Sequence, residues 1–307
     1  MLYNIQKYIF YKKERMIKLK KALIIGSGPA GISASLYLAR NNNIEVTVVS
    51  HGESALLKAD KIENYFGFAE PVSGKALLEN GIAGAKRLGV KFEKSEVLNL
   101  QFTNDLKFEA LTTLGSDIYD TVMIATGAKR AKPKFKGITE FEGRGVSYCA
   151  VCDAFFYRNK ATAVIGSGEY ALHEASALTN TSSSVTILTD GEQLKPDLPE
   201  GINRIDKKIK ELVGSDKIEA VIFEDGSRLD ISGVFIAVGT AGSSDIARKI
   251  GAAVDGSRIS VDSEMATTIP GLYAGGDCIG GLLQVSKAVY DGASAAMSMI
   301  KFLKSSK

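Results

Sequence analysis

One pattern of residues occurs twice in the 307-residue chain, first from Lys21 and again from Lys160. Each copy has an apolar strand, Gly-Ser-Gly, a helical pattern, a polar break and a second β-branched strand. The two stretches are KALIIGSGPAGISASLYLARNNNIEVTVVS and KATAVIGSGEYALHEASALTNTSSSVTILTD. A strand, a glycine turn, a helix and a returning strand form a βαβ unit with parallel strands. The chain is therefore predicted to contain two dinucleotide-fold units.

Both units continue in the same way. The stretches YDTVMIATG, ending at Gly127, and ISGVFIAVG, ending at Gly239, are apolar strands that end in glycine. Short alternating strands with turn residues precede each of them, and a tail of short strands and a helix follows the second. We predict an α/β protein with two Rossmann-like, three-layer ββα domains, the first of them discontinuous. The predicted division is residues 1–20 as a flexible extension, 21–130 with 241–307 as the first domain, and 131–240 as the second.

Composition narrows the class of protein. Hydrophobic residues make up 45% of the chain and charged residues 24%, as in a soluble globular protein. A net charge of +3 is too small to indicate a nucleic-acid partner, and no apolar run approaches the roughly 18 to 20 residues of a membrane span. Three cysteines are too few for a disulfide scaffold, so we expect a reducing, cytoplasmic compartment.

The first glycine motif, Gly26-Ser-Gly-Pro-Ala-Gly31, lies between a strand and a helix. Gly26 permits the tight turn, Gly28 lets the backbone approach a pyrophosphate, and Gly31 lets helix and strand pack closely. This context predicts dinucleotide binding. The acid expected at the end of the second strand is missing, because Ser50-His51 stands there and Glu53 comes slightly late.

The second glycine motif, Gly166-Ser-Gly-Glu-Tyr-Ala171, fits a dinucleotide less well than the first. Glu169 places a negative charge where a pyrophosphate would lie, and no cation follows the next strand until Lys195. An NADPH site needs cations for the 2′-phosphate. The favoured interpretation is a domain that kept the fold and lost the nucleotide, and the alternative is an NADH site with Asp190 on the ribose.

Cys149 and Cys152 are separated by two residues, and Asp153 follows directly. A structural zinc site needs four ligands, and the remaining cysteine and the histidines form no second pair. A redox dithiol fits the spacing better. Asp153 is a candidate proton donor and acceptor, and it is also a candidate helix N-cap, since both roles are compatible.

The other candidate residues have two possible roles or none. Cys278 is a third redox group or, as favoured, a small buried side chain, and neither His51 nor His173 is assigned a role. Five cations between Lys129 and Lys136 form a solvated linker or, alternatively, a docking surface for an acidic partner.

Together these residues resemble the low-molecular-weight thioredoxin reductase family of flavoproteins. The resemblance runs from Ala22 to the C-terminus and rests on IIGSGPAG, IENYFGF, IATGA, GRGVSYCAVCDAFF and TTIPGLYAGGDC. It implies FAD in the first domain and a redox disulfide in the second. It also implies a homodimer and a domain rotation that presents the dithiol alternately to the flavin and to thioredoxin.

The resemblance also implies roles for single residues. Cys152 corresponds to the sulfur near the flavin, Cys149 to the thiol that attacks the thioredoxin disulfide, and Asp153 to the acid/base. Asn64 and the 284–286 stretch correspond to positions near the flavin ring, and Asp277 to the ribityl and phosphate region. The implied cofactor-binding residues are Gly26, Gly28, Pro29, Ala30, Gly31, Asn64, Val97, Ala125, Thr126, Gly127, Asp277, Gln284, Val285 and Ser286.

Departures from the family pattern concern the electron donor. The family's GGQL after the second strand is ESALLKADKIENY here, its HRR is LTDG, and its Arg-Gln before the last helix is Leu283-Gln284. These losses gather where NADPH would bind, as in ferredoxin-dependent flavin thioredoxin reductases. We therefore expect reduced ferredoxin as the donor. The alternatives are an NADH- or NADPH-dependent thioredoxin reductase and, of another class, a redox-sensing flavoprotein, against which the intact cysteine pair argues.

Overall fold

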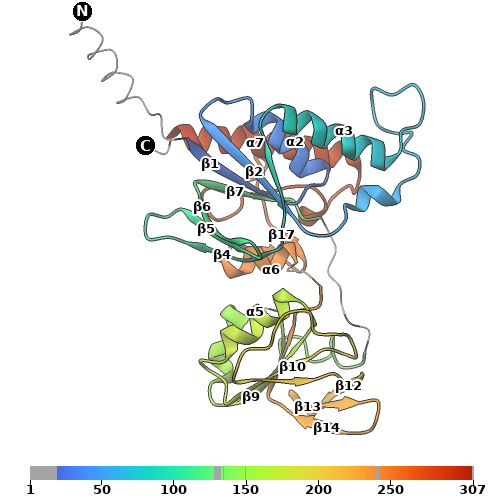
Figure 1. The fold of residues 1–307 in the computed structure, drawn as a ribbon, viewed down its shortest axis with the longest axis vertical. Helices are drawn as coiled ribbons and strands as arrows, with labels where there is room; N and C mark the ends of the chain where they lie inside the picture. The colour runs from blue at the N-terminus through green and yellow to red at the C-terminus, as the bar shows by residue number, and fades with distance from the viewer. Residues whose placement is uncertain (1–18, 128–132, 134, 149, 240–241, 306–307) are drawn as a thin grey trace, which may run out of the picture.

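The computed structural model describes residues 19–127, 133, 135–148, 150–239 and 242–305, with only the backbone at 151 and 152. Two α/β domains lie one above the other in Figure 1. The predicted extension lies outside the described residues except for its last two positions. The predicted domain boundaries at 130 and 240 also lie outside them.

The first domain is built on a parallel sheet in the order β18-β7-β1-β2-β3. Its strands are β1 (Lys20–Ile25), β2 (Ile44–Ser50), β3 (Lys91–Lys94), β7 (Thr121–Ile124) and β18 (Leu272–Ala274). Strand β18 follows the whole second domain in the chain, so the predicted return of the C-terminal segment to the first sheet is present. Buried β-branched and aliphatic residues fill the inner strands β1, β2 and β7 because both faces of the sheet are covered there, whereas the edge strand β3 has no buried residue.

Helices cover one face of this sheet. They are α2 (Pro29–Leu38), α3 (Gly74–Arg87) and the C-terminal α7 (Val285–Ser305), with the short turn η1 (Ala55–Lys58) beside them. Small residues let α2 and α7 lie very close: a Cβ added at Gly292 of α7 would stand 2.1 Å from the carbonyl oxygen of Ala30 in α2. Packing at this distance ties the C-terminal helix to the helix that follows the first glycine motif.

A second layer covers the other face of the sheet. An antiparallel sheet of β4 (Val97–Phe102), β5 (Phe108–Thr112) and β6 (Gly115–Tyr119) forms it, with α6 (Ser243–Lys249) beside it. The hairpin β16 (Val254–Asp255) and β17 (Arg258–Ile259) and the turn η3 (Asp277–Ile279) complete the domain.

The second domain repeats the plan. Its parallel sheet has the order β11-β10-β9-β15-β8, and an antiparallel sheet of β12, β13 and β14 packs against it. The repeated βαβ unit is β9 (Ala161–Ile165), α5 (Glu169–Leu178) and β10 (Ser184–Leu188). The other elements are β8 (Val146–Ser147), α4 (Ala150–Asp153), η2 (Ala154–Tyr157), β11 (Ile202–Ile205), β12 (Ile209–Gly214), β13 (Ile218–Phe223), β14 (Arg228–Asp230) and β15 (Gly233–Ile236). Both domains are thus the predicted three-layer ββα fold.

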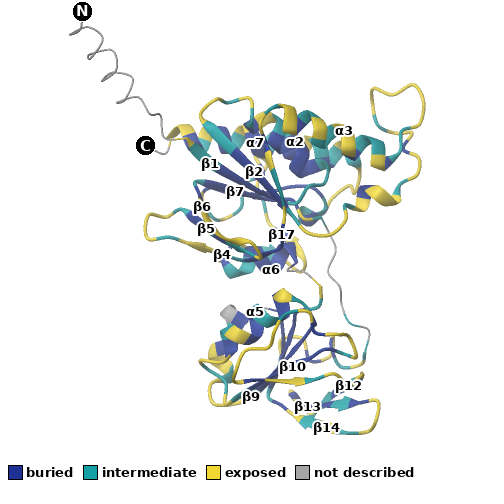
Figure 2. Cartoon of the chain, in the orientation of Figure 1, coloured by how far each residue is buried: buried dark blue, intermediate teal, exposed yellow. Residues whose placement is uncertain are grey.

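Buried residues continue from one domain into the other. Figure 2 shows dark-blue segments in both sheets and in the facing helices α5 and α6. One apolar cluster contains Leu98 and Ile246 of the first domain together with Ala150 and Tyr170 of the second. The domains therefore share packed side chains. Among the described helices, none is both long enough and apolar enough to span a bilayer.

Candidate active site

A cavity of about 940 Å³ opens at the carboxyl ends of the first sheet's strands. This edge is where open α/β sheets bind their ligands, and the size suits a large cofactor. Of the fourteen cofactor-binding residues implied by the resemblance, those that line the cavity are Gly26, Gly28, Pro29, Ala30, Asn64, Val97, Ala125, Thr126, Gly127, Asp277, Gln284 and Val285. Gly31 and Ser286 do not line it.

The first glycine motif has the geometry that a diphosphate requires. Gly26 has φ +114°, and a Cβ there would stand 2.3 Å from the carbonyl oxygen of Ala125. A Cβ at Gly31 would stand 2.0 Å from the carbonyl oxygen of Gly26. Helix α2 begins with no side-chain cap and no acid in its first turn, so its first N–H groups face the cavity as donors for an anion. These residues fit the pyrophosphate of FAD.

Asn64 and Gln284 meet at the rim of the cavity, where Asn64 Nδ2 donates a hydrogen bond of 2.9 Å to Gln284 Oε1. Asn64 lies in the exposed segment after η1, and Gln284 directly precedes α7. The two positions that the resemblance assigns to the flavin region therefore lie side by side.

The turn that carries Asp277 is fixed by two residues that the sequence analysis missed. The carboxylate of Asp291, buried in α7, accepts a 2.8 Å hydrogen bond from the backbone N–H of Gly276. Lys287 Nζ pairs with Asp291 at 2.8 Å and donates to the carbonyl oxygens of Gly276 and Gly280. The spacing of four residues between Lys287 and Asp291 on one helix is the signal that could have indicated the pair.

The end of β2 also contributes residues that were assigned no role. Ser50, His51 and Glu53 all line the cavity, and the buried Glu96 joins them from the neighbouring layer. Glu53 is exposed and lies shortly after β2, which ends at Ser50. The only signal for Ser50, His51 and Glu53 was their place at the end of an apolar strand.

The described part of the dithiol motif lies in α4 of the second domain. Cys149 lies outside the described residues, and only the backbone of Cys152 is described, in α4. Asp153 ends α4, and its Oδ2 accepts a 2.6 Å hydrogen bond from Ser147 Oγ. Although Asp153 stands at the N-cap position of η2, its side chain makes no cap hydrogen bond, so the N-cap interpretation is wrong. Burial, and then the charge of Asp153, raises the pKa of the nearby Tyr157.

The second glycine motif is in contact with the loop that follows β10. Ser167 is buried, and its Oγ donates a 2.5 Å hydrogen bond to Glu192 Oε2. The backbone N–H of Lys195 donates to the carbonyl oxygen of Ser167. Asp190, the candidate ribose ligand, instead accepts a 2.7 Å hydrogen bond from the backbone N–H of Ile209. The loop after β10 thus lies against the motif.

The remaining candidates are placed as follows. Cys278 is buried, as the favoured interpretation of a small buried side chain predicted, and burial raises the pKa of its thiol to about 12. The proposed docking segment 129–136 lies outside the described residues except for Pro133, Phe135 and Lys136. Across the described part of the chain, no group of three or more potential metal ligands comes together.

Comparisons with known proteins agree with this geometry. Residues 20–292 match the family model described as pyridine nucleotide-disulphide oxidoreductase. Thioredoxin reductase of Aquifex aeolicus is 34% identical, over 94% of this chain and 95% of its own. The solved structure of the atypical thioredoxin reductase TRi from Desulfovibrio vulgaris Hildenborough is 36% identical, with a TM-score of 0.87 over 94% of this chain and 99% of its own. That of a ferredoxin-flavin thioredoxin reductase from Clostridium acetobutylicum is 30% identical, with a TM-score of 0.67 over the same shares. The chain therefore belongs to the thioredoxin reductase family of FAD-binding flavoproteins.

Proposed function

We propose that this protein is a thioredoxin reductase that takes its electrons from reduced ferredoxin and uses FAD and the Cys149–Cys152 pair. The observation that carries the donor assignment is the contact between Ser167 and Glu192 in the second domain. The carboxylates of Glu192 and Glu169 stand at the loop and helix start where a pyridine nucleotide would place its diphosphate. Two negative charges there repel such a ligand.

The surroundings of Asp190 support the same assignment. Its Oδ1 is held by the backbone N–H of Ile209, and Lys208 Nζ lies 3.8 Å from its other oxygen. A ribose 2′-hydroxyl would have to compete with these contacts for the Asp190 carboxylate. The similarity to a ferredoxin-flavin thioredoxin reductase and to an atypical thioredoxin reductase is consistent with a donor other than NADPH.

In the first domain, the proposed FAD site uses the α2 N-terminus for the diphosphate and Asp277 for the ribityl region. Bound FAD supplies a group that can take up single electrons and release them in pairs. Lys287 and Asp291 hold the turn of Asp277, and Asn64 and Gln284 close one side of the cavity. These residues bind and orient the cofactor in the proposal.

In the second domain, the reduced Cys149 would attack one sulfur of the thioredoxin disulfide, and Asp153 would pass the Cys149 thiol proton to the sulfur that leaves. Cys152 would then attack the Cys149 sulfur of the mixed disulfide and displace the second thioredoxin sulfur, which would take up the Cys152 thiol proton. The Cys149–Cys152 disulfide re-forms, and thioredoxin leaves as a dithiol, so two electrons and two protons have been transferred. Ser147, which donates to Asp153 at 2.6 Å, would hold that carboxylate in place.

We further propose a homodimer in the cytoplasm. Tyr290 and Met297 are exposed and seven residues apart, so they share one face of α7, and the exposed Tyr37 lies on the neighbouring α2. An apolar face of this kind suits a partner surface. Light scattering of the purified protein would give the mass of two chains, and a single-chain mass would contradict the dimer. The compartment follows from the small number of cysteines.

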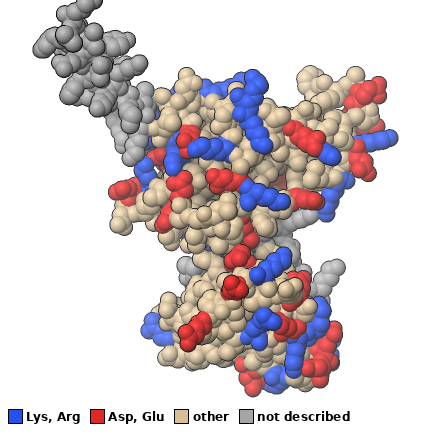
Figure 3. All heavy atoms as spheres, in the orientation of Figure 1, with Lys and Arg blue, Asp and Glu red and all other residues tan. Residues whose placement is uncertain are grey.

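The basic segment 129–136 is the proposed docking site for an acidic ferredoxin. On the face shown in Figure 3, Lys and Arg residues are interspersed with Asp and Glu over both domains, so the described part of that face presents no large basic area. Replacing Lys129, Lys132 and Lys134 by Ala should weaken the ferredoxin-dependent reaction most at low salt.

The test is an anaerobic reduction of the purified yellow protein. Photoreduced ferredoxin should bleach the flavin absorbance and support thioredoxin reduction, whereas excess NADPH or NADH should not. Cys152→Ser should keep the first effect and lose the second. Rapid bleaching by either nucleotide would disprove the donor assignment, and a protein that reduces no thioredoxin with ferredoxin present would favour the redox-sensing alternative.

A further inference from the structure

Two oppositely charged side chains are buried between the domains. Helix α5 of the second domain faces α6 of the first in Figure 1, with Glu174 on α5 and Lys249 at the end of α6. Lys249 Nζ lies 2.5 Å from Glu174 Oε1, and the two side chains are 0% and 1% exposed. Charges lose their hydration when they are buried, so a pair this deeply buried must satisfy its remaining hydrogen-bonding groups locally.

The further contacts of Glu174 and Lys249 join α4, the dithiol helix, to the first domain. Glu174 Oε2 accepts a 2.7 Å hydrogen bond from the backbone N–H of Ala150, which opens α4 directly after Cys149. Lys249 Nζ donates at 3.1 Å to the carbonyl oxygen of Leu98 in β4 and lies 4.9 Å from the ring of Tyr170. A continuous chain of contacts therefore runs from β4 through both charges to the start of α4.

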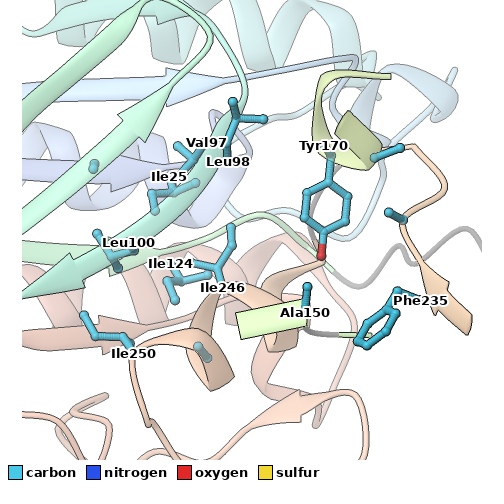
Figure 4. Packing of buried hydrophobic residues seen from close by; sticks show 14 of the residues in the cluster. Ile25, Val97, Leu98, Leu100, Ile124, Ala150, Tyr170, Phe235, Ile246 and Ile250 are labelled. Carbon is cyan, nitrogen blue, oxygen red and sulfur yellow. The ribbon is translucent and has the colours of Figure 1, made fainter. Parts of the chain in front are cut away.

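Apolar residues surround these contacts. Figure 4 shows the Tyr170 side chain directed towards Ala150, and Ile246 of α6 and Ile250 directly after α6 belong to the same apolar cluster. Because both side chains are buried, a small shift of one domain against the other would leave a charge buried without its partner. Only a shift that carries both charges completely into water would avoid this. Such a pair selects one arrangement strongly, whether or not it adds net stability.

We propose that Glu174 and Lys249 are positioning residues that hold the dithiol helix against the FAD domain, and that this pair must open before the second domain can change its position. The proposal rests on the proposed role of the Cys149–Cys152 pair. Glu174 fixes the peptide that follows Cys149, and Lys249 fixes Glu174 to the first domain. Electron exchange between the dithiol and the flavin site therefore depends on both residues.

The test compares Lys249→Met, Glu174→Gln and the double variant with wild type. Arg248→Met is the matched control, because Arg248 is the neighbouring residue of α6 and its contacts to Asp245 and the Gly256 carbonyl stay within the first domain. The first readout is the anaerobic bleaching of the flavin by dithiothreitol, which acts through the cysteine pair, at equal FAD content. The second readout is the radius of gyration from small-angle scattering.

We expect the single variants and the double variant to bleach about tenfold or more slowly and to show a larger radius of gyration, with Arg248→Met unchanged. The double variant leaves no unpaired charge, so it tests the proposal even if the single variants do not fold. Wild-type bleaching and wild-type dimensions in the double variant would overturn it. Neither readout uses ferredoxin or a nucleotide, so failure of the donor assignment would leave this result intact. If dithiothreitol bleaches a Cys152→Ser protein at the wild-type rate, the proposed dithiol route is refuted instead. The scattering comparison would then still decide whether the Glu174–Lys249 pair fixes the two domains.

Discussion

Asn64 and Gln284 lie 220 positions apart in the chain and are joined by a 2.9 Å hydrogen bond at the rim of the cavity. Asn64 belongs to a segment that is mostly exposed, whereas Gln284 directly precedes α7, a helix packed against α2. The bond thus ties a weakly packed segment to a rigid element. It closes one side of the proposed flavin site.

Replacing Asn64 by Ala is expected to weaken FAD binding without unfolding the protein. An exposed hydrogen bond contributes about 1 kcal/mol, so the dissociation constant for FAD should rise roughly fivefold. Titration of the apoprotein with FAD, followed by flavin fluorescence, measures this change. Asn99→Ala is the control, since Asn99 makes only a 3.4 Å hydrogen bond to Gln101 away from the cavity. Equal affinity in the two variants would show that the bond does not shape the site.

Gly292→Ala should destabilise the protein and its cofactor site together. The new methyl group would meet the carbonyl oxygen of Ala30 at 2.1 Å, so α7 must move away from the helix that follows the first glycine motif. Overpacking of this kind costs about 1–3 kcal/mol of unfolding free energy. Urea unfolding of the FAD-loaded protein checks the prediction. Gly84→Ala on α3 is the control, because its added Cβ would lie 3.8 Å from Leu36, an ordinary contact.

The two-domain fold could be predicted because its signals are local and occur twice. Gly26 and Gly166 both follow apolar strands, and a second β-branched strand comes after the helix that follows each of them. The partners of the site could not be predicted in the same way. Nothing near Glu174 in the sequence indicates that Lys249, 75 positions later, lies against it, because domain packing alone brings them together.

Removing the two carboxylates at the second glycine motif should make nucleotide binding measurable. In a Glu169→Ala, Glu192→Ala double variant, each lost negative charge relieves about 0.3–1 kcal/mol of repulsion at the helix start. We therefore expect NADH to bind about threefold to thirtyfold more tightly than to wild type, as measured by calorimetric titration. Glu224→Ala, an exposed site in the same domain, should leave NADH binding unchanged. Tight binding of NADH to the wild type would contradict the proposed role of these carboxylates.

The position of Glu192 against the second glycine motif could not be predicted from the sequence. Glu169 was recognised because it lies within the glycine motif, and the structure places it in the first turn of α5. Glu192 lies 25 positions after Ser167, in a loop with no regular pattern, yet it makes the closer contact with the motif. Periodicity in the sequence predicts where the residues of a helix or strand lie, whereas the position of a loop residue depends on how the loop folds back.

His173 is expected to make stability depend on pH. Its Nε2 has no hydrogen-bond partner among the described residues, and burial, followed by the charge of Lys249, lowers its pKa below 6.5, with Glu174 opposing in part. The unfolded chain therefore binds a proton at a higher pH than the folded protein does. As the pH falls below about 6.5, the unfolding free energy should drop by at most about 1.4 kcal/mol per pH unit through this group. Urea unfolding at several pH values, compared between wild type and His173→Gln, isolates the effect, with the exposed His51→Gln as control. Parallel pH profiles for wild type and His173→Gln would contradict the prediction.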